Sequence, residues 1–191
     1  MFTCAKRKMR PAWLLLSLFI LSQPALAAPV ETPYSAVSLP FELHQVANTP
    51  AYYIVGESGV PGADNEGHTS NAGFVVTKEG VVVFDGLGTP ALGYRMIQRI
   101  REVTNQPIKK IIVSHYHADH IYGLQAFKEH GDAPEVIAQR HTLGYLGGNR
   151  ASQGEAAQRR LDQRREALFP WVDENTCLLY TSDAADDLLH V

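Results

Sequence analysis

Residues 110–120 read KIIVSHYHADH, and this run is the most informative part of the sequence. Residues 110–114 at its start, with Ile111, Ile112 and Val113 in sequence, predict a buried strand. While the backbone stays extended, His115 and His117 point to the same side of the chain, and Asp119 and His120 follow after it turns. Because open α/β sheets bind ligands outside the carboxyl ends of their strands, this spacing predicts a binding cavity at this point.

The side chains in this stretch are typical metal ligands. Histidine nitrogens and carboxylate oxygens suit Zn²⁺, with iron and manganese as alternatives. We therefore predict a metal site whose ligands are His115, His117, Asp119 and His120. The four side chains could instead only satisfy a loop, but ionisable groups crowded behind a buried strand are costly unless they are paired or metal-bound.

Patterns on either side of this stretch predict an α/β fold with a mixed sheet. Residues 72–77 and 81–84 are apolar runs joined as a hairpin, and the second run is apolar on both faces, as expected of a buried strand. Thr89 as N-cap and Pro90 at the first helical position begin a helix, and the next buried strand follows it. We expect strands over 41–46, 52–55, 72–77, 81–84, 110–114 and 135–139, and helices over 90–103, 121–130 and 155–169.

The first 27 residues have the organisation of a secretory signal peptide. Four basic residues precede an apolar run over 12–21, and Ala25–Ala27 is a small-residue cleavage signal. The run has about half the length that spans a bilayer, so we expect cleavage after Ala27 and a periplasmic or secreted protein without membrane attachment. An uncleaved anchor is the alternative. Residues 28–40 are the expected linker.

Composition limits the partners. Removal of the four basic residues of the signal peptide changes the formal net charge from −3 to −7. A mildly acidic chain favours neither nucleic acid nor an anionic membrane as partner. We expect a small-molecule substrate instead.

The end of the chain differs from the rest. The run Cys177–Asp187 resembles the translation of a transposase sequencing adapter, so we expect 177–191 to be an artefactual tail outside the fold. A genuine C-terminal helix is the alternative. With Cys4 in the signal peptide and Cys177 in the tail, no cysteine remains for a disulfide or a thiolate ligand. The expected domain is then 41–176.

At these residues the sequence resembles the metallo-β-lactamase superfamily. The resemblance covers roughly 41–176, and its anchors are the strand and turn at 81–85 and the motif at 115–120. Residues 69–74 and 114–127 look closest to exported branches linked to sulfur oxidation and to quinoprotein relay systems. The resemblance implies an αββα sandwich, of which this chain supplies the N-terminal half.

The resemblance also implies roles for individual residues. His115 and His117 match ligands of a first zinc, and Asp119 and His120 match ligands of a second. Asp85 matches an acidic residue that supports the ligands from behind. The implied chemistry uses one or two zinc ions and a metal-bound hydroxide as nucleophile. Asp119 is the implied catalytic residue, which orients that water or takes its proton.

The sequence departs from the family pattern after the motif. The family takes its remaining metal ligands from well downstream, and this chain offers only His130, His141 and His190 there. We expect the first two to be surface residues, and His190 lies in the expected tail. We therefore expect an incomplete domain that binds zinc weakly and has little activity.

Three functions compete. The leading interpretation is a zinc-dependent hydrolase acting on an ester, thioester or lactam bond. The second is an iron-dependent oxidoreductase of sulfur compounds from the same superfamily. The third is a non-catalytic metal-binding accessory protein whose site has decayed; the intact motif argues against it.

Two lesser features have plain and functional interpretations. His68 and Asn71 lie in a glycine-rich loop, where they could border the mouth of the site or form a turn. An arginine cluster, consisting of Arg159, Arg160, Arg164 and Arg165, could bind an anionic substrate. Interleaved acidic residues favour a solvated helix face instead.

Overall fold

The computed structural model describes residues 32–139, 142 and 151–176. The expected signal peptide, the start of the expected linker and the expected tail lie outside these ranges. The strands are β1 (His44–Gln45), β2 (Ala51–Ile54), β3 (Ala72–Thr77), β4 (Gly80–Phe84), β5 (Ile108–Val113) and β6 (Glu135–Ala138). The helices are α1 (Pro90–Val103), α2 (Ala118–Ile121), α3 (Leu124–His130) and α5 (Ala151–Leu168).

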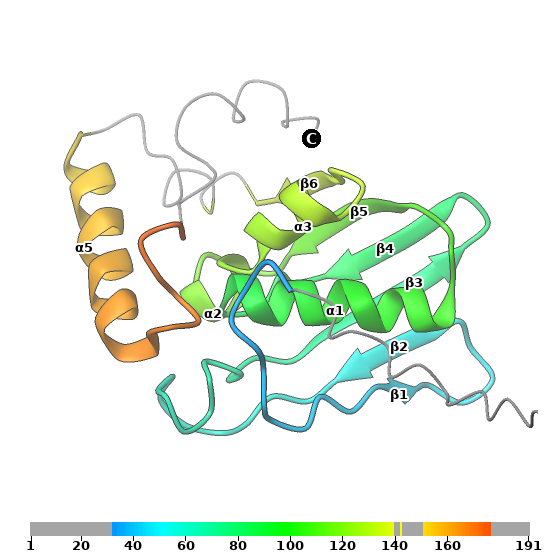
Figure 1. The fold of residues 1–191 in the computed structure, drawn as a ribbon. Coiled ribbons are helices and arrows are strands. Elements are labelled where there is room, and N and C mark those ends of the chain that lie inside the picture. The colour runs from blue at the N-terminus through cyan, green and yellow to red at the C-terminus, as the bar shows by residue number, and fades with distance from the viewer. Residues whose placement is uncertain (1–31, 140–141, 143–150, 177–191) are drawn as a thin grey trace, which may run out of the picture. The chain divides into compact units, whose positions relative to one another are not determined.

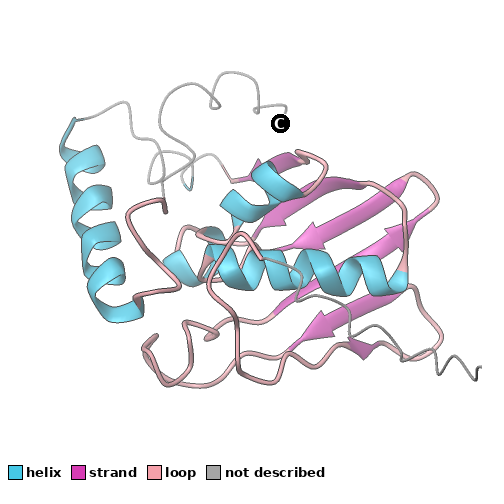
Figure 2. Cartoon of the chain, in the orientation of Figure 1, coloured by secondary structure: helices cyan, strands magenta, loops and turns pink. Residues whose placement is uncertain are grey.

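The six strands form one mixed sheet in the order β1-β2-β3-β4-β5-β6. Strands β1 to β4 pair antiparallel, whereas β4, β5 and β6 pair parallel. Helix α1 connects β4 to β5 and lies across one face of the sheet, with α3 packed beside it (Figures 1 and 2). The predicted α/β class with a mixed sheet is confirmed.

The core lies between this face of the sheet and the helices. Val83 of β4 and Ile111 of β5 pair in register and are fully buried, as are Leu92 and Met96 of α1. The expectation that β4 is buried on both faces is wrong, and the predicted buried strand β5 is also exposed on one face. Phe84 is 49% exposed and Ile112 37% exposed, because the described helices cover only one face of the sheet.

The expected helix over 121–130 is interrupted at Gly123. Its amide donates to the Leu87 carbonyl over 3.0 Å. A Cβ atom at this position would lie 2.0 Å from the Gly86 carbonyl oxygen, closer than any real contact. Only glycine allows the turn after β4 to approach the helices this closely, and the approach divides the segment into α2 and α3.

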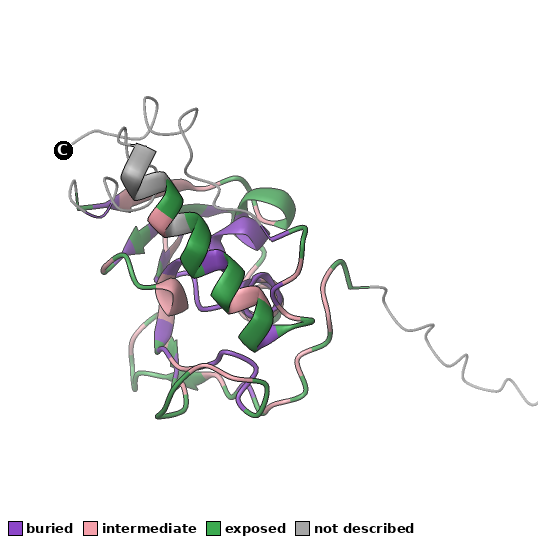
Figure 3. Ribbon diagram, turned by 90° about the vertical axis from the view of Figure 1, so that its left-hand side faces the viewer, coloured by how far each residue is buried: buried purple, intermediate pink, exposed green. Residues whose placement is uncertain are grey.

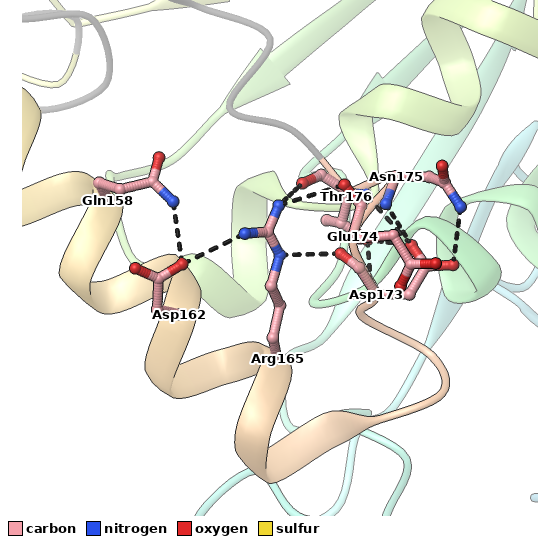
Figure 4. Close-up of polar contacts among 7 residues, drawn as sticks. All are labelled: Gln158, Asp162, Arg165, Asp173, Glu174, Asn175 and Thr176. Atoms are coloured by element: carbon pink, nitrogen blue, oxygen red, sulfur yellow. Dashed lines mark hydrogen bonds and ion pairs between the residues drawn. The ribbon is translucent and has the colours of Figure 1, made fainter.

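Helix α5 begins at Ala151, four residues before the expected start, and is exposed along much of its length (Figure 3). Arg165 departs from the solvated face expected for the arginine cluster. Its guanidinium donates to the carbonyls of Asp173 and Thr176, each over 2.8 Å, and pairs with Asp162 at 3.2 Å (Figure 4). Arg165 therefore fastens the segment after α5 to the helix.

The described part of the expected linker packs against the domain. Trp171 donates its indole N–H to the Ala36 carbonyl over 2.9 Å, and both carboxylate oxygens of Glu66 accept the Ser38 amide, at 2.9 and 3.1 Å. Among the helices that the structure describes, none is long and apolar enough to cross a membrane.

Candidate metal centre

The parallel strands β4 and β5 bring Asp85 and Ser114 together at their carboxyl ends. The Asp85 amide donates to the Ile112 carbonyl over 2.9 Å, which continues the parallel pairing. The Asp85 backbone then turns to a positive φ of 63°, a conformation that aspartate tolerates better than most residues. Its carboxylate accepts the Ser114 amide at 2.7 Å and the Ser114 hydroxyl at 2.8 Å. The two strand ends are therefore tied through one buried carboxylate.

The same carboxylate orients His120. The Nδ1 atom of His120 lies 2.8 Å from Asp85 Oδ2, and its Nε2 atom lies 3.6 Å from Asp119 Oδ2. Two ligands of one tetrahedral zinc, with bonds of 2.0–2.1 Å, are about 3.4 Å apart. Asp85 therefore contacts one nitrogen of a predicted ligand, and the other nitrogen of His120 faces Asp119 at a separation that suits a shared ion.

The other two histidines follow in a chain of ring contacts, His115 against His120 and His117 against His115. The ring centroid of His115 is 4.1 Å from that of His120 and 4.5 Å from that of His117. His115 Nδ1 lies 2.9 Å from the Ser114 hydroxyl, which leaves its Nε2 atom for a metal. His117 caps α2 with extended backbone. The structure thus brings the three imidazole rings and Asp119 into one neighbourhood.

The side chains do not converge on one point as they lie. Among the residues that the structure describes, no three His, Cys, Asp or Glu side chains form a group that could hold a metal ion. The chemistry of the donors and the hydrogen bonds that orient His115 and His120 fit zinc. The full set of four ligands stays a prediction.

Burial opposes the effect of the local hydrogen bonds and charges at Asp85 and His120, but it acts together with the neighbouring histidine charges at His115. Burial opposes ionisation of Asp85, but hydrogen bonds from His120 and Ser114 outweigh it and lower the pKa of this carboxyl. Burial also opposes protonation of His120, but the hydrogen bond to Asp85 and the charges of Asp85 and Asp119 raise its pKa. Burial, followed by the charges of His120 and His117, lowers the pKa of His115. Neutral imidazole is the form that binds a metal.

Sequence reasoning missed two serines that contact the site. Ser114 bonds to Asp85 and lies beside His115, and its position directly before the motif was a usable signal. Ser70 donates its hydroxyl to the main-chain carbonyl of Asp119, 49 residues away. No local pattern could have indicated that contact.

Of the remaining candidates, only Asn71 borders the site in the described part of the chain. Asn71 helps to line a cavity of about 700 Å³ whose walls include Asp85, Ser114 and His120. His68 is only 3% exposed, so it is a buried residue and not part of the rim. His130 packs against the rings of Tyr34 and Tyr94, whereas His141 and His190 lie outside the described residues.

Residues 65–176 match the metallo-beta-lactamase superfamily. This region includes Asp85, the whole HxHxDH motif and α5, and it makes up more than half of the chain. The protein therefore belongs to the metallo-β-lactamase superfamily. Membership supports, at the level of the family, a metal-dependent function of the hydrolase type. No curated protein matches the sequence.

Solved structures with a related fold are distant. A metallo-β-lactamase from Hirschia baltica is 17% identical, with a TM-score of 0.45, over 64% of this chain and 48% of its own. One from Pontibacter korlensis is 18% identical, with a TM-score of 0.43, over 55% and 46%. MEM-A1, a subclass B3 metallo-β-lactamase from a soil metagenome library, is 26% identical, with a TM-score of 0.40, over 56% and 36%. The chain spans about half or less of these proteins.

Proposed function

We propose that this protein is a zinc-dependent hydrolase that acts on an ester, thioester or lactam bond. One observation carries the proposal: the Asp85 carboxylate holds Nδ1 of His120 at 2.8 Å and thereby turns Nε2 toward Asp119. A buried carboxylate behind a histidine fixes the tautomer and ring orientation that metal binding requires. Superfamily membership gives the same direction independently.

The ligands proposed for zinc are His115, His117, Asp119 and His120. Bound zinc would supply a water of lowered pKa and a positive charge beside the substrate carbonyl. The second role proposed for Asp119 is catalytic, because its carboxylate would orient the attacking water or take its proton. Asp85 keeps His120 oriented and is not available for proton transfer, since hydrogen bonds from Ser114 and His120 occupy it.

Metal binding by the chain tests this proposal first. The purified protein, stripped of metal, is titrated with zinc and separately with ferrous iron, and bound metal is quantified by mass spectrometry. We expect zinc to bind, and His120→Ala to weaken binding by about tenfold or more because one ligand is lost. His44→Ala, at an exposed position on the edge strand β1, is the matched control and should bind zinc like the wild type.

Hydrolysis is then assayed with an activated ester, an activated thioester and a chromogenic lactam. Zinc-dependent turnover of any of them, even at the low rate expected of this chain, supports the proposal if it is lost in Asp119→Ala. Preferential iron binding with oxygen consumption would favour an oxidoreductase of sulfur compounds. Tight metal binding without turnover would favour an accessory protein.

A further inference from the structure

His68 is buried in the loop that precedes β3, although its side chain is polar. It is 3% exposed, and its ring stacks on Phe41 with the centroids 5.2 Å apart. Within the described part of the chain, two buried side-chain polar atoms have no hydrogen-bond partner, and they are neighbours: Nε2 of His68 and Oγ1 of Thr69. This place accommodates a neutral imidazole, but it offers no acceptor for a second N–H.

The acidic groups nearby do not stabilise a protonated His68 ring enough to outweigh its burial. Among the described residues, the charges that act on His68 are those of Glu57 and Glu66. Glu66 is itself buried and committed to Ser38, whose amide and hydroxyl it accepts. Glu57 is exposed, so solvent screens its charge. Burial is the dominant influence and lowers the pKa of His68.

The loop around His68 packs directly on the predicted metal centre. A Cβ atom on Gly88 would lie 2.5 Å from the Gly67 carbonyl oxygen and 3.3 Å from the Asp119 Cα, so three backbone segments meet here without side chains between them. Two residues after His68, the Ser70 hydroxyl donates to the Asp119 carbonyl. A displacement of residues 67–70 would therefore also displace the backbone of Asp119 at the start of α2.

We propose that His68 is a positioning residue that, when protonated, leaves its place beside Phe41 and loosens the backbone that holds Asp119. In the closed form of the loop the His68 ring is buried beside Phe41, and in the open form it is exposed to solvent. Above about pH 6.5, the ordinary pKa of histidine, the imidazole is neutral in both forms, and the closed form keeps its full stability. As the pH falls below that value, the open form takes up a proton that the closed form resists. Each further pH unit then favours opening by about tenfold, until the pKa of the buried ring is reached.

Amide hydrogen exchange of the metal-free chain tests the proposal without relying on activity. Protection factors, corrected for the intrinsic pH dependence of exchange, are compared between about pH 7.5 and 5.5. We expect protection of 67–70 and of 117–121 to fall together by about tenfold in the wild type. Protection of β4 should not change.

Two variants separate His68 from the histidines of the motif. His68→Phe replaces the imidazole by an apolar ring that cannot titrate. In this variant the amide protection of residues 67–70 should be independent of pH. His68→Gln is a second uncharged variant in case the phenylalanine variant does not fold. Constant protection of 67–70 in the wild type, or a pH response that persists in both variants, would overturn the proposal.

Zinc affinity provides a second measurement, which rests on the proposed function. We expect the wild type and His68→Phe to bind zinc equally at about pH 8, and the wild type to lose affinity faster than the variant on acidification. If neither protein binds zinc at pH 8, the proposed function fails. Hydrogen exchange still decides the role of His68.

Discussion

Strands β4 and β5 lie side by side and run in the same direction, yet their carboxyl ends have opposite environments. Residues 85–90, which follow β4, are all buried, and Asp85 and Leu87 adopt positive φ angles of 63° and 71°. Residues 114–117, which follow β5, are exposed or half-buried. The first end is part of the core, and the second presents the predicted ligands. The comparison shows that the buried turn after β4, with its two positive φ angles, supports the neighbouring exposed loop after β5, which carries the predicted metal ligands.

Gly123→Ala should have the largest effect on stability, because the new side chain would clash with the buried turn after β4. The added methyl group would lie 2.0 Å from the Gly86 carbonyl oxygen, and backbone cannot move aside as a side chain can. We expect a loss of about 3 kcal/mol or more in the free energy of unfolding. Urea denaturation followed by circular dichroism measures it. A variant with wild-type stability would show that the approach of α2 and α3 to the turn after β4 is not required.

Asp85→Ala should follow, since this residue joins the two strand ends. It leaves the Ser114 amide and His120 Nδ1 without their partner, which we expect to cost about 2 to 3 kcal/mol and to weaken zinc binding by about tenfold or more. Asp85→Asn is the matched control, because asparagine tolerates the positive φ and still offers one acceptor oxygen. Equal losses in both variants would mean that charge, and not the hydrogen bonds, is decisive.

Asp132 stabilises the opposite, amino end of β5. Its carboxylate accepts the Ile108 amide and pairs with Arg101, both at 2.6 Å. Burial opposes its ionisation, but these partners outweigh burial and lower its pKa. The stabilisation is therefore complete above the ordinary pKa of aspartate and lost as the pH falls through the lower value in the fold. Asp132→Asn should lose about 1 kcal/mol at pH 7, and the difference from the wild type should vanish in acid, as denaturation at several pH values would reveal.

His117→Ala should have the smallest effect on folding. The side chain is exposed and caps α2 without a side-chain hydrogen bond, so the free energy of unfolding should change by no more than about 0.5 kcal/mol. Zinc affinity should nevertheless fall by about tenfold or more. A large loss of stability in the metal-free protein would contradict the view that the end of β5 serves binding and not folding.

Elements that depend on local periodicity could be predicted from the amino-acid sequence alone. The apolar runs of β3, β4 and β5, the N-cap and proline that begin α1, and the spacing of the four predicted ligands all follow from neighbouring residues. Here the chemistry of each side chain and the pattern of backbone hydrogen bonds act over a few positions, which is why the mixed α/β fold could be predicted and confirmed.

Contacts between residues far apart along the chain could be identified only from the three-dimensional fold. The Ser70 hydroxyl on the Asp119 carbonyl, the buried place of His68 beside Phe41, and the break at Gly123 arise from segments packed at backbone distance. The exposure of Phe84 and Ile112 also follows from which face the helices cover. These features depend on close packing between elements that are far apart along the chain. A pattern within one segment cannot predict such packing.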